Sequence, residues 1–149
     1  MFNPTQVYEE LRGDSLSGRE LEASLLVRAA AELNKCAQLW PERDSKHFQE
    51  KLDEALRFNQ KLWTLLQMEL SNPEHPAPEP LRKNLLRLSR YIDQRIFSLF
   101  AGGELGDLHM LSKINEELAA GLFAGAEGSI TKESASSLAE NGPTIDILA

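Results

Sequence analysis

The chain of 149 residues fits one domain and is long enough to bury a core without disulfides or metal ions. Its net charge of −7 disfavours attraction of the whole surface to nucleic acid or anionic lipid. The single cysteine, Cys36, excludes an intramolecular disulfide framework, which favours a reducing compartment. No apolar run approaches the roughly 18 residues that cross a bilayer, and the N-terminal stretch has no hydrophobic signal segment. The sequence therefore predicts a cytoplasmic protein.

The first helix is expected over residues 18–39. Ser17 and Glu20 have the spacing of a capping box, in which each side chain bonds the backbone amide of the other residue. Apolar residues then recur at three- and four-residue intervals, and Pro41 cannot continue the helix. Residues 1–16 contain few apolar groups, so we predict a flexible arm there.

The second helix is expected to begin after a cap at Asp44 or Ser45 and to continue to Leu70 with an unbroken apolar face. The segment 71–80 follows it and holds four of the seven prolines. A segment of this composition favours extended geometry and predicts a semi-rigid connection between two helices.

A third helix is expected to start at Pro80, because proline suits the first helical position. The glycine pair at 102–103 terminates it. A fourth apolar face occupies positions 108–122, and Gly125 closes that helix. Residues 125–149 are rich in Ser, Ala, Glu, Gly and Asn, which predicts a low-complexity, disordered tail.

No segment alternates with the period of a strand, so the fold class is all-α. We expect a small helical bundle of about four helices with a flexible N-terminal arm and C-terminal tail. The predicted domains are an arm at 1–16, a helical domain at 17–124 and a disordered tail at 125–149.

Catalytic and metal-binding patterns are not found in the sequence. His47, His75 and His109 lie in different segments, and no carboxylate is spaced to complete a metal site with them. Cys36 lies on the apolar face of the first helix and is expected to be a small buried hydrophobic residue. We therefore predict a protein that is not an enzyme and uses no metal or cofactor.

Three asparagines, Asn59, Asn84 and Asn115, lie beside or within apolar helix faces. Burying an unpaired amide costs roughly 1–3 kcal/mol, so each should pair with a neighbouring helix or line a groove that a partner fills. The second and third helices are also apolar over more than one face, as expected of a central helix or of one that presents a groove. We place such a partner groove along the second, third and fourth helices, at Asn59, Trp63, Leu66, Asn84, Leu85, Tyr91, Asn115 and Leu118. For Trp63, the alternative to a position in the groove is packing in the core.

The sequence is acidic overall but contains a basic patch at Arg82, Lys83, Arg87 and Arg90. This patch has three interpretations: an ordinary charged helix face, a surface that contacts an acidic partner, or a surface that contacts RNA phosphate. No aromatic residues interleave these cations as they do on base-stacking surfaces, so RNA is the weaker functional interpretation.

Several pieces of the chain, in order, resemble the FlaF family of flagellar biosynthesis proteins from α-proteobacteria. The matching pieces are RELEA at 19–23, AL at 55–56, NQKLWTLL at 59–66, PLRKNLLRLS at 80–89 and INEELAAGL at 114–122. Tyr8 also matches an early tyrosine of the family. The tail after Gly125 departs from it, since family members commonly stop near the end of the fourth helix.

The resemblance implies a small, helical, non-enzymatic factor needed for flagellin production and export, with flagellin and the regulator FlbT as partners. It implies no particular functional residues. The resulting hypothesis is a secretion chaperone that binds flagellin and regulates its synthesis or export. The alternatives are a post-transcriptional regulator that contacts RNA through the basic patch, and a general helical interaction scaffold.

Overall fold

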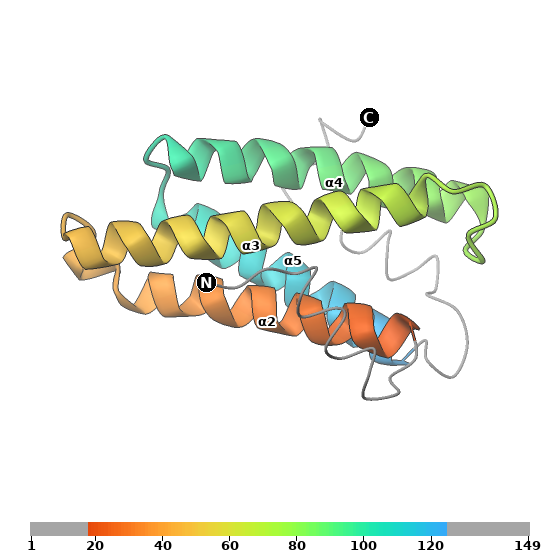
Figure 1. Cartoon of the computed structure of the whole chain (residues 1–149), viewed down its shortest axis with the longest axis horizontal. Coiled ribbons are helices and arrows are strands. Elements are labelled where there is room, and N and C mark those ends of the chain that lie inside the picture. The colour runs from red at the N-terminus through yellow and green to blue at the C-terminus, as the bar shows by residue number, and fades with distance from the viewer. Residues whose placement is uncertain (1–17, 125–149) are drawn as a thin grey trace.

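A computed structural model of the chain describes residues 18–124, which form an up-down-up-down bundle of four α-helices (Figure 1). The helices are α2 (Gly18–Gln38), α3 (Lys46–Leu70), α4 (Glu79–Phe100) and α5 (Leu105–Ala124), with a short 3-10 helix, η1 (Trp40–Glu42), between α2 and α3. The all-α prediction is confirmed. The predicted arm, the predicted tail and the Ser17 cap lie outside the described residues.

The helix boundaries follow the local signals in the sequence closely. Ser45 caps α3, with the Phe48 amide donating to its hydroxyl at 3.1 Å. Pro41 lies inside η1, so the chain turns tightly after α2 instead of continuing. Pro80 occupies the first turn of α4, which begins one residue earlier than predicted.

The turn between α4 and α5 uses two glycines in conformations that other residues rarely adopt. Gly102 has φ of 117° and Gly103 has φ of 22°. A Cβ atom on Gly103 would lie 2.7 Å from the Leu99 side chain, so only glycine fits this close approach. The predicted termination of the third helix at this pair is therefore confirmed.

The closest pair of helices is α2 and α5, which run antiparallel. Small side chains at Ala23, Ala30 and Ala119 are buried in these two helices and allow a short interaxial distance. The Ser112 hydroxyl lies 3.3 Å from the Ala30 carbonyl oxygen of the other helix, which is possible only when the backbones are near each other. The second antiparallel pair is α3 and α4, and α2 joins the two pairs by packing on α3.

A buried polar network crosses the centre of the bundle. The Asn115 amide donates to Asn59 Oδ1 at 2.7 Å, and Trp63 Nε1 donates to Asn115 Oδ1 at 3.0 Å. The Asn59 amide in turn donates to the carbonyl oxygens of Ala55 and Ala29, at 2.9 and 3.3 Å. All three side chains of the network are buried. For Asn59 and Asn115, the structure contains the first of the two predicted alternatives, which is pairing between helices.

Replacing Leu62 by alanine should lower the free energy of unfolding by about 2–5 kcal/mol, because its side chain is 1% exposed and its loss leaves a cavity. Urea denaturation of the purified protein measures this change. The neighbouring exposed residue gives the control: Lys61→Ala should change stability little. A loss at Leu62 no larger than that at Lys61 would contradict the described core.

Candidate partner-binding site

An apolar cavity of about 280 Å³ lies at one end of the described bundle. At this end α2 begins, α3 ends, α4 begins and α5 ends, and in Figure 1 α2 and α3 diverge toward it. The cavity therefore lies where the α2/α5 pair separates from the α3/α4 pair. Its lining consists of Gly18, Arg19, Glu22, Trp63, Leu66, Glu69, Leu70, His75, Pro76, Ala77, Leu85, Leu118 and Leu122.

The apolar part of the lining comes from three helices and one connection. Helix α3 contributes the side chains of Trp63, Leu66 and Leu70, and α5 contributes those of Leu118 and Leu122. Leu85 completes the lining from α4, together with Ala77 from the connection before it. Each of these side chains is largely buried, so the cavity is an extension of the core that opens to the surface rather than a separate surface groove.

Two carboxyl groups, Glu22 from the start of α2 and Glu69 from the end of α3, also line the cavity. The Glu69 carboxyl lies close enough to Glu22 to act on its protonation. Burial raises the pKa of Glu22 well above its ordinary value, hydrogen bonding with Glu69 and the negative charge of Glu69 raise it further, and Arg19 opposes the shift. Glu22 therefore keeps its proton at neutral pH.

His75 lines the same cavity from the α3–α4 connection and is half-buried. Its Nδ1 accepts a hydrogen bond from the Ala77 amide at 3.1 Å, which identifies Nδ1 as the unprotonated ring nitrogen. Burial lowers the pKa of His75, with Glu69 acting in the opposite direction. The neutral imidazole is therefore the form present at physiological pH.

The eight predicted groove residues fall into two groups. Trp63, Leu66, Leu85 and Leu118 meet at the cavity although they come from three different helices. The other four lie elsewhere, since they are absent from its lining: Asn59, Asn84, Tyr91 and Asn115.

The four residues outside the cavity have different surroundings. Asn59 and Asn115 form the central network, and Asn84 is half-buried beside Leu85 on α4. Tyr91 is fully buried, with its hydroxyl against the Met110 sulfur and the Arg95 guanidinium 5.1 Å from its ring centre.

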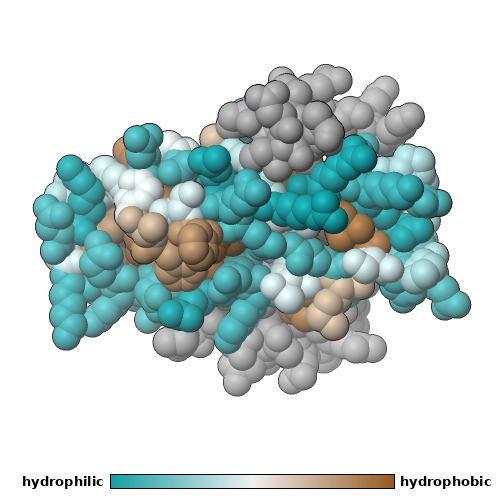
Figure 2. All heavy atoms as spheres, turned by 90° about the horizontal axis from the view of Figure 1, so that it is seen from above, coloured by the Kyte–Doolittle hydropathy of each residue, from teal (hydrophilic) through white to brown (hydrophobic). Residues whose placement is uncertain are grey.

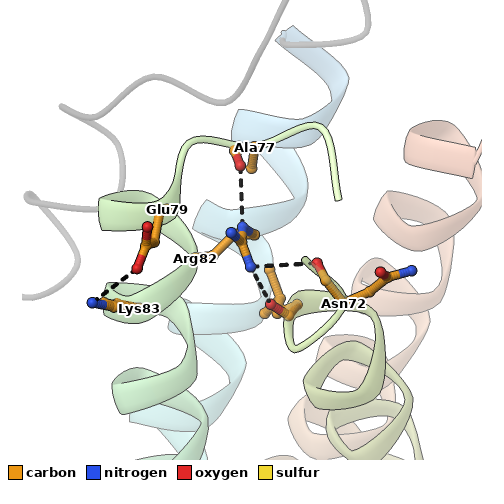
Figure 3. Close-up of polar contacts among 6 residues, drawn as sticks. Asn72, Ala77, Glu79, Arg82 and Lys83 are labelled. Carbon is orange, nitrogen blue, oxygen red and sulfur yellow. Dashed lines mark hydrogen bonds and ion pairs between the residues drawn. The ribbon is translucent and has the colours of Figure 1, made fainter. Parts of the chain in front are cut away.

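Arg82 of the predicted basic patch is directed inward, onto the connection that forms one side of the cavity (Figure 3). It donates to the carbonyl oxygens of Ala77 at 3.2 Å and of Leu70 and Asn72 at 3.3 Å. These bonds satisfy carbonyl groups around the end of α3, where a cation is also favoured by the helix dipole. Arg82 thus fixes the proline-rich connection to both of the helices that it joins.

The remaining basic residues lie along the exposed side of α4. Lys83 pairs with Glu79 at 3.0 Å, and both side chains are exposed (Figure 3). Arg87 and Arg90 are exposed farther along the helix. Of the four predicted patch residues, Arg82 has a different role from the other three.

A separate hydrophobic area lies on α4, away from the cavity. Figure 2, which views the face that carries α4, shows hydrophobic side chains near the end where this helix terminates. Phe97 is 76% exposed and Phe100 is 40% exposed, with the Arg57 guanidinium 5.6 Å from the Phe100 ring centre. The surplus apolar residues predicted on α3 and α4 therefore separate into buried ones, such as Phe58 and Tyr91, and this exposed area.

Cys36 is 1% exposed, as predicted, and burial raises the pKa of its thiol to about 11. The neutral thiol is a poor nucleophile, so this cysteine acts as part of the core. Among residues 18–124, no three histidine, cysteine, aspartate or glutamate side chains are grouped so that they could hold a metal ion. None of the described helices combines the length and apolarity needed to cross a membrane.

The sequence interpretation did not single out Glu22 and Glu69. A signal was present, because Glu22 precedes Leu26 by four residues and Ala29 by seven. Glu69 likewise follows Leu66 by three residues and Leu62 by seven. A charged residue that continues an apolar face at helical spacing is a candidate for a partly buried position.

The fold and the cavity define a small up-down-up-down helical bundle with an apolar hollow at one end. Comparison with protein families gives a match to the family described as Flagellar protein FlaF over residues 4–122. This match covers most of the chain, which therefore belongs to the FlaF family of flagellar proteins, and the resemblance read from the sequence is confirmed. Comparisons with curated proteins and with solved structures gave no match.

Replacing Arg82 by alanine should lower the free energy of unfolding by about 1.5–3 kcal/mol, the range for hydrogen bonds that involve a charged group. Lys83→Ala is the matched control, because Lys83 is the next residue of the same helix but has an exposed ion pair. Chemical denaturation of both variants measures the difference. Equal effects at the two positions would contradict the role of Arg82 in holding the connection.

The Glu22 proton makes stability depend on pH. Above the ordinary glutamate pKa of 4.5 the folded protein keeps this proton and the unfolded chain does not. Unfolding then releases a proton, so rising pH favours it, up to the raised pKa of the folded state. The stability of the wild type should fall relative to Glu22→Gln by up to about 1.4 kcal/mol per pH unit.

Denaturation midpoints and slopes at several pH values from about 5 to about 8 measure this difference. Glu50→Gln is the control, because Glu50 is exposed near the start of α3. A stability difference between wild type and Glu22→Gln that stays constant over this range would show that Glu22 is ionised in the folded protein.

Proposed function

We propose that the protein binds flagellin as a secretion chaperone and through this binding regulates flagellin synthesis and export. The observation that carries the proposal is the apolar cavity that opens where the two helix pairs diverge. Membership of a flagellar protein family supports a flagellar partner. Of the two partners that the resemblance implies, we choose flagellin, because its terminal segments before assembly are amphipathic helices that would aggregate if they stayed exposed.

The lining of the cavity favours apolar side chains of a protein segment as its occupant. Its volume is about 280 Å³, and most of the residues around it are apolar. It can accept one or two large apolar side chains of an amphipathic helix laid across the bundle end. Such anchors, at i, i+3 or i+4 spacing, would complete the core between α3 and α5.

The affinity should be moderate. An unassembled segment loses conformational entropy when it becomes a helix on its partner, and this loss offsets part of the gain from apolar burial. Moderate affinity suits a chaperone, because the flagellin must leave again when it is exported.

Filling the cavity tests the proposal without removing any core side chain. Ala77 lines the cavity and is 8% exposed, so Ala77→Phe should occupy the space that the flagellin anchor needs. We expect flagellin binding to weaken by about tenfold or more, which corresponds to at least about 1.4 kcal/mol. Titration calorimetry with monomeric flagellin measures it.

The matched control is Ala31→Phe, which adds the same ring at an exposed position of α2. It should leave the affinity unchanged, and circular dichroism should show an intact helical fold for both variants. Wild-type affinity in Ala77→Phe with the fold intact would place the binding surface elsewhere. An absence of binding by the wild type would exclude flagellin and make FlbT the next partner to test.

A post-transcriptional role through RNA is the second candidate. The exposed Lys83, Arg87 and Arg90 favour it, whereas the inward direction of Arg82 reduces the number of available phosphate contacts. The salt dependence separates the two functions. Binding through six or more phosphates weakens by roughly 10³-fold or more between about 50 and 200 mM salt, and apolar anchoring changes little.

A further inference from the structure

We infer that the segment entering the cavity carries a lysine or arginine next to its apolar anchor, and that this cation binds between Glu22 and Glu69. The inference rests on the proposed function and specifies the chemistry of the partner. It identifies the two carboxyl groups as the residues that select the partner segment. The apolar lining alone would accept any segment with a leucine or phenylalanine of suitable size.

The position of the two carboxyl groups supports this assignment. Glu22 and Glu69 come from different helices and meet at the cavity, whose other helical contributions are almost entirely apolar. A segment that places an anchor against Trp63 and Leu118 therefore enters the same cavity that Glu22 and Glu69 line. A lysine or arginine there keeps its apolar stem against the lining and brings its charged end to the carboxylates.

The other charged groups around the pair leave room for a cation. Arg19 of α2 lies near Glu22 and contributes one positive charge against two carboxyl groups. His75 from the connection is neutral, and the Arg82 guanidinium is held by three backbone carbonyls. The cavity residues from α4 and α5 are apolar: Leu85, Leu118 and Leu122. Counted over the described residues that line the cavity, the fully ionised pair would thus have one negative charge in excess, which a partner cation would neutralise.

In the free protein this charge imbalance is removed because Glu22, whose pKa burial raises, keeps its proton at neutral pH. A bound ammonium or guanidinium group favours the ionised form of both carboxyls. Binding therefore breaks the O–H bond of the protonated carboxyl, and the proton passes to the buffer while the partner's cation keeps its own protons. The expected stoichiometry is up to one proton released for each complex formed.

Proton release has a measurable consequence for affinity. Because the bound state holds fewer protons than the free state, the dissociation constant falls as pH rises. The slope approaches tenfold per pH unit while the free pair holds its proton, and it levels off above the pKa of Glu22. A purely apolar anchor would leave the proton in place and give a flat profile, and an acidic anchor would take up a proton and give the opposite slope.

Titration calorimetry of the full chain with monomeric flagellin, near neutral pH and in two buffers with different ionisation enthalpies, tests the inference. The observed heats should differ in the direction of proton release. For Glu22→Gln, which cannot release this proton, the heats in the two buffers should agree more closely and the affinity should be nearly independent of pH. Glu50→Gln is the control and should behave as the wild type, because Glu50 does not line the cavity.

The outcomes separate the inference from the proposed function. Binding of flagellin with buffer-independent heats, or with proton uptake, overturns the cationic anchor and leaves flagellin binding standing. Proton release that persists in Glu22→Gln also overturns it, because the proton then comes from another group. No binding in either buffer by a folded protein overturns both. Should Glu22→Gln fail to fold, the pH dependence of the wild-type affinity gives the same decision.

Discussion

The hydrogen bonds among Asn59, Asn115 and Trp63 fix how three of the four helices lie against one another. Each amide is buried, and a buried amide left without a partner costs roughly 1–3 kcal/mol. A shift of α5 along α3 by one turn would break the Asn115 bonds to both Asn59 and Trp63. The bond from Asn59 to the Ala29 carbonyl extends the same constraint to α2. Apolar packing alone tolerates such shifts more readily, because it is not directional.

The position of the cavity follows from this constraint. Trp63 belongs to the network through its indole nitrogen, and it also lines the cavity. The network therefore fixes where the last two turns of α3 lie relative to the last turns of α5. Arg82 holds the opposite side, because its bonds attach the α3–α4 connection to the end of α3. The hollow is thus bounded on two sides by hydrogen-bonded elements, which favours a pre-formed site with little reorganisation on binding.

In the proposed binding mode, the apolar lining and the carboxyl groups of Glu22 and Glu69 would select the partner segment in two different ways. Burial of apolar area would supply most of the binding free energy, and it would favour any segment that removes enough apolar surface from water. Carboxyl groups discriminate among such segments, because a partner that leaves them buried without a cation gains nothing from their charge. In the proposed function, this division of roles would let a protein of a flagellar family select one unassembled chain among many.

Helix number, helix ends and family could be read from the sequence, because caps, prolines and glycines act within a few residues of their own position. Ser45, Pro80 and the glycine pair at 102–103 show this directly. Contacts between distant segments could not be read in the same way. Apolar spacing identifies a buried face but not the helix it meets, so Trp63, Leu66, Leu85 and Leu118 could be grouped only loosely. The inward direction of Arg82 and the proximity of Glu22 to Glu69 arise from how the four helices pack. The residue pattern of one helix does not specify which other helix will lie against it.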